Sequence, residues 1–468
     1  MRIKNIYCIL IITLSVICVS CSKWLDTKPK SQISEAALFE NEQGFKDALI
    51  GVYVKLASRE LYAKEFTMGL VDVLARQYDV DATSSAYYQA GQYEYKDIST
   101  QAKINTFWIN AYSAIANLNN LLEAINGKES LFTHNNYQII KGEAFALRAL
   151  VHFDLLRAFG PVPTLGMDNA SIPYVTTFDM DVKKALPTGT ILEKCLADLD
   201  TAKSLLSVRK EVVTGISDIF LSNTRNHMNY WAVIGLMARI NLYRGATEAA
   251  YSQSMEVIQS GLFPFITSEE VSAVSSPNRT FTMEQLFGIY VSNLTDINAE
   301  LFKSSSLSQL LTTKEDAINQ IFDVSSGGST DYRYLYLWKT EGASGIKYPA
   351  KYWQDDITNS NFRNRVPVIK LAEMYFIAAE TAPNQAASIS LLNQVRQNRG
   401  QQLLSAELSK SNLSDELTKS YQKEFYQEGQ LFYYYKRKNV TQLSGYPSPI
   451  TPAIYQLPQP DDEKEFNP

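Results

Sequence analysis

The stretch from Tyr137 to Pro163, YQIIKGEAFALRALVHFDLLRAFGPVP, constrains the fold of this chain more than any other. Apolar residues recur in it at steps of three and four, which predicts one long amphipathic helix. They are Ile140, Ala144, Leu147, Val151 and Leu155. Gly160 can adopt the left-handed conformation that closes a helix, and Pro161 cannot continue one, so we expect the helix to end at Gly160. We interpret its polar residues, Arg148, His152, Asp154 and Arg157, as salt-bridged or solvated, with a catalytic role as the alternative.

The same stretch carries a recognisable pattern. It resembles the signature helix of the SusD/RagB family, the surface glycan-binding lipoproteins of Bacteroidetes, whose pattern is E-A-x-x-x-R-A-x-x-x-x-D-L-x-x-x-F-G-x-V-P. The matching residues are Glu143, Ala144, Arg148, Ala149, Asp154, Leu155, Phe159, Gly160, Val162 and Pro163. Ten matches in one short stretch are far more specific than a lone glycine-rich loop.

Later segments are similar to other signatures of that family. One runs from Lys370 to Glu380, and another from Glu424 to Arg437 includes Glu428 and Gly429. The second departs from the family at Leu431 and Tyr434, where Arg and Asp are usual, which leaves the ion pairing of that helix open. We interpret the acids and arginines of these signatures as structural groups that satisfy helix ends and form buried pairs.

The N-terminus has the form of an export signal. Arg2 and Lys4 precede an apolar run over residues 6–19, which is too short to span a membrane. Residues 1–20 therefore read as a lipoprotein signal peptide and 21–31 as lipid anchor and tether, with Cys21 as the lipidated residue. An ordinary secretory signal is the alternative. Only Cys195 then remains, so we expect no intramolecular disulfide and a small buried side chain at that position.

The remaining chain divides by pattern. Helical periodicity fills residues 32–261 and 365–440, whereas 262–364 is rich in Ser, Thr, Asn and Gly and reads as an irregular insert with a few short strands. The family resemblance implies a single domain over 32–468. It also implies a mainly α fold of tetratricopeptide-like helix pairs that form a right-handed superhelical scaffold, although no clean 34-residue repeat is visible.

Aromatic residues are the candidate ligand contacts. The 28 tyrosines exceed what a core hides comfortably, because each buried hydroxyl needs a partner. Residues 76–99 form a polar, Tyr-rich loop, and the insert carries further aromatics, so the six candidates are Tyr78, Tyr87, Tyr88, Tyr93, Trp338 and Trp353. Alternate spacing from Tyr332 to Trp338 predicts one aromatic face of a strand, interpreted as packing on helices, with ligand contact as the alternative.

Motifs for catalysis and metal binding are lacking. The mature chain has three histidines and no H-E-x-x-H, C-x-x-C, P-loop or G-x-S-x-G pattern. Asp79 and Asp81 stand without further ligand spacing and are interpreted as solvated loop acids. The sequence therefore predicts a protein that is not an enzyme and holds no cofactor, and its net charge of −5 argues against nucleic acid as the main partner.

Two functions remain open. The resemblance implies a lipid-anchored protein on the outer face of the outer membrane that captures a glycan. It also implies a partner, a SusC-like TonB-dependent transporter over which the protein would sit as a lid. The alternative is a helical-repeat lid or scaffold that binds peptide or protein cargo, since stacked helices form concave binding surfaces.

Overall fold

The structure is a computed structural model that describes residues 35–466, apart from 81, 216–217, 219, 304–309, 341–346, 444–445 and 447–448. The predicted signal peptide, the anchor Cys21 and the tether lie outside the described residues, as does Asp81. These assignments, and the division of the chain into one domain with an insert, stay predictions. Within the described residues no helix is both long and apolar enough to cross a membrane.

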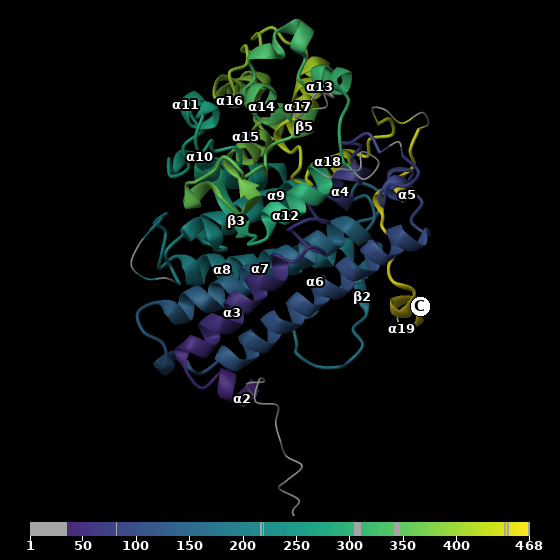
Figure 1. The fold of residues 1–468 in the computed structure, drawn as a ribbon. Helices are drawn as coiled ribbons and strands as arrows, with labels where there is room; N and C mark the ends of the chain where they lie inside the picture. The colour runs from purple at the N-terminus through teal and green to yellow at the C-terminus, as the bar shows by residue number, and fades with distance from the viewer. Residues whose placement is uncertain are drawn as a thin grey trace, which may run out of the picture.

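Four long helices lie side by side in the lower half of Figure 1. In spatial order they are α3 (Glu42–Leu56), α6 (Ile98–Ile125), α7 (Asn136–Phe159) and α8 (Thr188–Leu206). The short η1 segment (Glu129–Leu131) joins α6 to α7, so the two form the helical pair that the sequence predicts. Between its neighbours α7 is buried around almost its whole circumference, which makes it the central helix of the fold.

The array continues upward through further pairs. Helix α8 packs against α9, α9 against α10, α10 against α15 and α15 against α16, with α17 and α18 completing the C-terminal side. Their bounds are α9 Tyr230–Tyr243, α10 Thr247–Gln259, α15 Leu371–Glu380, α16 Gln385–Gln397, α17 Lys410–Glu424 and α18 Leu431–Lys438. This succession of paired helices around one apolar core confirms the mainly α prediction.

Shorter elements fill the connections. The short helices are α2 Glu35–Leu38, α4 Leu70–Leu74, α5 Tyr88–Gly91, α11 Ser268–Ser272, α12 Leu294–Phe302, α13 Glu315–Ile321, α14 Tyr332–Tyr336 and α19 Asp461–Phe466. The 3-10 turns are η2 Thr224–Asn226, η3 Thr282–Glu284, η5 Val324–Ser326, η6 Gly328–Thr330, η7 Ser360–Phe362 and η8 Pro452–Tyr455. The strands form antiparallel pairs, β1 Ala170–Pro173 with β2 Ala185–Pro187, β3 Gln285–Tyr290 with β6 Arg365–Lys370, and β4 Trp338–Thr340 with β5 Lys347–Pro349.

The end of α7 differs in mechanism from the prediction. The helix ends at Phe159 as expected, but Gly160 is extended, with φ −77° and ψ 169°, and not left-handed. A side chain at Gly160 would come within 2.7 Å of the Leu156 carbonyl oxygen. Glycine is therefore required here for space. The carbonyl oxygens of Arg157 and Gly160 accept hydrogen bonds from the buried Lys436 ammonium, which caps the helix.

The predicted aromatic strand is wrong. Residues 332–336 form helix α14, and strand β4 begins only at Trp338. The Asp331 carboxylate accepts from the backbone N–H of Arg333 and caps the start of the helix. The buried Arg333 side chain then fixes the helix by binding the carboxylates of Asp331 and Glu424. A helical start at Pro367 is also wrong, because Pro367–Lys370 pairs with β3 before α15 begins.

Candidate functional site

A cleft of two adjoining pockets lies where the loop after α4 meets α13, α17 and α18. The larger pocket has a volume of about 440 Å³ and the smaller about 250 Å³. Both are lined by Asp323 and Lys419, which form the boundary between them. The larger volume lies in the range of small-molecule binding sites. The four helices that converge here are labelled in the upper right part of Figure 1.

The larger pocket combines polar side chains with two tyrosine walls. The tyrosines are Tyr78, from the loop after α4, and Tyr435, from α18. The polar side chains around them are Arg76, Gln77, Asp79, Gln320, Asp323, Lys419 and Gln422. Amides and carboxylates next to aromatic rings suit sugars, whose hydroxyls need hydrogen bonds and whose C–H faces pack on rings.

Gln77 provides a hydrogen-bond donor in this pocket that the protein does not satisfy. Its side chain is 2% exposed, and its amide Nε2 has no partner within the described residues. The backbone of Gln77 is held in place, because its carbonyl oxygen accepts from the Thr313 hydroxyl at 2.8 Å. A buried donor without a partner is unfavourable by about 1–3 kcal/mol. Nε2 is covered in this structure, so a ligand oxygen would remove this unfavourable term once the amide turns toward the pocket that Gln77 lines.

Tyr435 is oriented by its neighbour on α17. The Gln422 amide donates to the Tyr435 hydroxyl oxygen at 2.8 Å. Burial raises the pKa of Tyr435 to about 12, so the phenol is neutral at physiological pH. Its own proton therefore remains available for donation.

The smaller pocket is polar, and its charges are already paired. Asp323 has a left-handed backbone, with φ 53°, which directs its carboxylate to Lys419 at 2.9 Å and Lys423 at 2.8 Å. Arg396 is paired with Glu416 at 2.9 Å. Burial alone would raise the pKa of Asp323, but the two lysines outweigh burial and lower it. The pocket thus presents compensated charges and not a free cation or acid.

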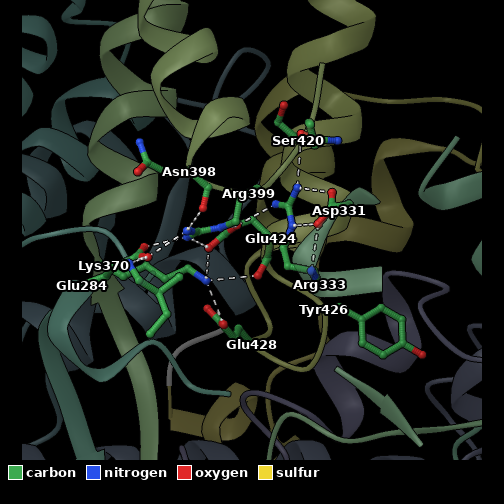
Figure 2. Close-up of polar contacts among 12 residues, drawn as sticks. Glu284, Asp331, Arg333, Lys370, Asn398, Arg399, Ser420, Glu424, Tyr426 and Glu428 are labelled. Carbon is green, nitrogen blue, oxygen red and sulfur yellow. Dashed lines mark hydrogen bonds and ion pairs between the residues drawn. The ribbon is translucent and has the colours of Figure 1, made fainter. Parts of the chain in front are cut away.

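A buried set of charged residues holds α17 behind the cleft. This charge cluster contains four acids and four cations, namely Glu284, Asp331, Glu424, Glu428, Arg333, Lys351, Lys370 and Arg399. Figure 2 shows Arg399, Arg333 and Lys370 directed at Glu424, the last residue of α17. Since Lys419 and Gln422 lie on the same helix, the cluster fixes the position of two pocket residues.

One of the six predicted aromatics, Tyr78, lines the cleft, and a second, Tyr93, lies near it without lining it. Tyr78 forms part of the wall, with its hydroxyl donated to the Met68 carbonyl. Tyr93 lies beside it, because its ring packs edge-on against Tyr446, at 5.2 Å between centroids, and the Arg76 guanidinium lies 5.6 Å above the Tyr446 ring. The Tyr-rich loop therefore lines the cleft through its first residues, Arg76 to Asp79.

The other four predicted aromatics do not line the cleft. Tyr87 is buried and donates to Glu65, and Trp353 is buried with the Lys303 ammonium 3.8 Å from the ring centroid. Tyr88 is half-buried in α5, and Trp338 is half-buried with its ring 4.9 Å from that of Tyr426. Tyr87 and Trp353 are buried to about the same degree as Tyr78, but they line neither pocket of the cleft.

Sequence reasoning missed most of the polar lining. Gln77, Gln422 and Tyr435 lie in three separate elements and carry no local pattern that marks a site. The Gly/Ser turn at residues 325–329 was visible, and it lies next to Asp323 in the smaller pocket. Among the described residues no group of three or more His, Cys, Asp or Glu side chains could hold a metal ion.

Comparison with known proteins agrees with this architecture. A SusD-like family model, described as "Starch-binding associating with outer membrane", matches residues 23–242. The chain is 21% identical over 452 residues to "SusD-like protein P25" of Formosa agariphila, covering 85% of this chain and 82% of the relative. Residues 23–242 therefore belong to the SusD-like family by sequence, and the Formosa agariphila relative extends the similarity over most of the chain.

Solved SusD-like structures show the same fold. A SusD superfamily protein from Bacteroides thetaiotaomicron aligns with a TM-score of 0.73 at 20% identity, covering 92% of this chain and 98% of the other. A structure from Bacteroides vulgatus, named a SusD-like carbohydrate binding protein, aligns with a TM-score of 0.72 at 19% identity, covering 91% and 96%. The helix pairs described above are thus the tetratricopeptide-like array of the SusD-like fold.

The SusD-like signature residues are internal in this chain. Arg148 is paired with Asp198 at 2.7 Å, and Glu373 with Arg239 at 2.6 Å. Arg437 binds Glu380 at 2.7 Å although Leu431 and Tyr434 depart from the usual pattern. These pairs confirm that the signature acids and arginines are structural. Cys195 is fully buried within α8, as expected for a small apolar side chain.

Proposed function

We propose that this chain binds an oligosaccharide in the cleft between the loop after α4 and helices α13, α17 and α18. The observation that carries the proposal is the unpaired, buried amide of Gln77 in a pocket of about 440 Å³ walled by Tyr78 and Tyr435. Tyr93 extends this surface beyond Arg76. Family membership supports the assignment, because the matching model is described as starch-binding.

The role is capture and not catalysis. Sugar hydroxyls accept from Gln77 and from the ordered side chains of α17, while a ring face packs against tyrosine. The acids of the smaller pocket are held by Lys419, Lys423 and Arg396, which leaves no carboxyl pair free to serve as acid and base across a scissile bond. The protein therefore delivers its glycan unchanged.

Delivery takes place at the cell surface. Acylation of Cys21 anchors the chain to the outer membrane, and a SusC-like TonB-dependent transporter receives the glycan. The description of the family as associated with the outer membrane supports this location. The residues after Cys21 up to Ser31 then act as a tether that lets the folded part cover the transporter.

The Gln77→Leu variant tests the site, because it keeps most of the bulk of the side chain and removes the donor. A broad panel of polysaccharides and their oligosaccharides is first screened for binding to the wild-type protein by affinity electrophoresis and calorimetry. We expect each glycan that binds to have about tenfold lower affinity for Gln77→Leu, which is the equivalent of one hydrogen bond. Gln259→Leu on the exposed end of α10 is the matched control and should bind as the wild type does.

Two outcomes would contradict the proposal. Equal glycan affinities of the Gln77→Leu and Gln259→Leu variants would remove the site from the cleft. Absence of glycan binding across the panel, together with binding of peptides, would favour the peptide-cargo hypothesis.

A further inference from the structure

Two buried arginines lie on elements that flank strand β3, one in η2 and one in β6. Arg225 belongs to η2, which packs against β3, and Arg365 is the first residue of β6, opposite Tyr290 of β3. Each arginine is only 4% exposed. Tyr290, in contrast, is half-exposed and marks where this part of the ladder meets solvent.

These two arginines lack the partners that the other buried arginines have. Within the described residues neither guanidinium forms a hydrogen bond or an ion pair, and the Nε atom of each is buried without a partner. The remaining buried arginines all bind a carboxylate; they are Arg148, Arg157, Arg239, Arg279, Arg333 and Arg399. The fold therefore supplies an acid for every buried guanidinium except this pair.

The electrostatic consequence is an uncompensated positive site. Burial lowers the pKa of Arg365 to about 10, with the nearby charge of Arg225 as the second cause. Burial also lowers the pKa of Arg225. Both groups still carry their charge at neutral pH. Two desolvated like charges without a counter-ion destabilise the fold, because nothing replaces the hydration that each charge has lost.

We infer that Arg225 and Arg365 bind a small oxyanion, namely a sulfate, phosphate or carboxylate group. A guanidinium presents a planar fork of N–H donors that matches the oxygens of these groups, and two forks can hold one anion from two sides. Tyr290 faces Arg365 across the ladder, so its hydroxyl, which accepts from the Asn364 amide at 3.1 Å, lies at the entrance.

The anion site is separate from the glycan cleft. None of Arg225, Tyr290, Asn364 and Arg365 lines either pocket of the cleft. The inference therefore does not depend on the proposed function, and either one can fail alone. The anion has two possible sources, a free inorganic ion or a charged substituent of a glycan, and both present the same oxygens to the arginines.

Calorimetric titration with sodium sulfate at constant ionic strength, with sodium chloride as the reference salt, tests the site. We expect saturable sulfate binding to the wild-type protein, and at least tenfold weaker binding to the Arg365→Gln and Arg225→Gln variants. Arg244→Gln, which changes an exposed arginine at the end of α9, should bind as the wild type does. Sulfate binding that all four proteins share would overturn the inference.

A stability measurement keeps the test valid if a variant folds poorly. In chloride alone, Arg365→Gln should unfold at the same temperature as the wild-type protein or higher, because it removes an uncompensated buried charge. In sulfate the order should reverse, since only the wild-type protein is stabilised by the ligand. The absence of this reversal in sulfate and also in glucose 6-sulfate would contradict an anion site.

A sugar sulfate identifies the source of the anion. Glucose 6-sulfate is titrated beside sodium sulfate and glucose. Binding of inorganic sulfate supports a free-ion site, and binding of glucose 6-sulfate alone supports recognition of a charged glycan. Failure of both anions to bind would overturn the inference.

Discussion

Replacing Glu424 by Gln tests whether the charge cluster determines the position of α17. The Glu424 carboxylate is fully buried and accepts from Arg399 Nε and Nη2 at 3.0 and 2.9 Å, from Arg333 Nη1 at 2.6 Å and from Lys370 Nζ at 2.9 Å. Gln has the same shape but no charge. The cluster then contains four cations and three acids, and one amide N–H₂ faces a cation.

The expected loss is large because the site is dry. Removing one partner of a buried ion pair lowers the free energy of unfolding by about 3–5 kcal/mol. Burial alone would raise the pKa of Glu424, but Arg399, Lys370 and Arg333 outweigh burial and hold it well below its usual range. A lowered carboxyl pKa stabilises the fold above the pKa of the unfolded chain, and this contribution is lost as the pH falls through the folded pKa.

Urea unfolding at pH 7, followed by tryptophan fluorescence, measures the loss. The control is Glu315→Gln, which breaks the exposed pair with Lys347, where the loss should stay below about 1 kcal/mol. Glu424 does not line the cleft, yet glycan affinity should also fall, because α17 carries Lys419 and Gln422. The reasoning is refuted if Glu424→Gln is no more destabilising than Glu315→Gln, or if it unfolds more easily while glycan affinity stays unchanged.

Two further predictions concern single buried positions. Burial lowers the pKa of His152 to about 3. As the pH falls below about 6.5, this histidine therefore takes up a proton in the unfolded chain but not in the folded one. His152 should account for about 2 kcal/mol of the free energy of unfolding that is lost between pH 7 and pH 5. His152→Gln should flatten the pH dependence of urea unfolding by that amount, and an unchanged slope would contradict a neutral buried ring. Gly429→Ala should lower the free energy of unfolding by about 3 kcal/mol or more, because φ is 69° and the new Cβ would lie 2.5 Å from the Phe66 carbonyl oxygen. Gly261→Ala, with φ 66° and open space, should lose only about 1–2 kcal/mol, and equal losses would exclude the clash.

The helices were predictable because their signals are local. Apolar spacing within the stretch from Tyr137 to Pro163 predicted α7 to within one residue at each end. The same reasoning failed where a distant contact decides local structure. Residues 332–336 alternate like a strand, but Arg333 is drawn to Asp331 and Glu424, and a helix results. Pro367 and its neighbours became a strand because β3 offers them a partner.

The candidate cleft was predictable only in part, because it is assembled from remote segments. Composition directed attention to the loop that holds Tyr78 and Tyr93, and the first residues of that loop line the candidate cleft. It could not separate Tyr78 in the pocket wall from Tyr87, whose hydroxyl binds Glu65 in the interior. Nothing along the chain links Gln77 to Tyr435, which meet only after the C-terminal helices have packed against α4.

The abundance of tyrosine has a structural cause that the sequence does not reveal. Buried tyrosines bind backbone carbonyls across the fold, as Tyr352 does with Gln427 at 3.1 Å and Tyr455 does with Val440 at 2.7 Å. Such a residue adds apolar area and satisfies a carbonyl that no helix partner reaches. Many tyrosines are therefore part of the core, and their number is no measure of a binding surface.

Under the proposed function, ligand choice in this chain depends on polar side chains that the family signatures do not include. The signature residues Arg148, Glu373 and Glu424 form internal ion pairs, which explains why they identify the fold and say nothing of the ligand. Gln77 and Gln422 can change without affecting those pairs. A site built this way allows one scaffold to accept different sugars, because the interactions that stabilise the fold and those that bind the glycan involve different residues.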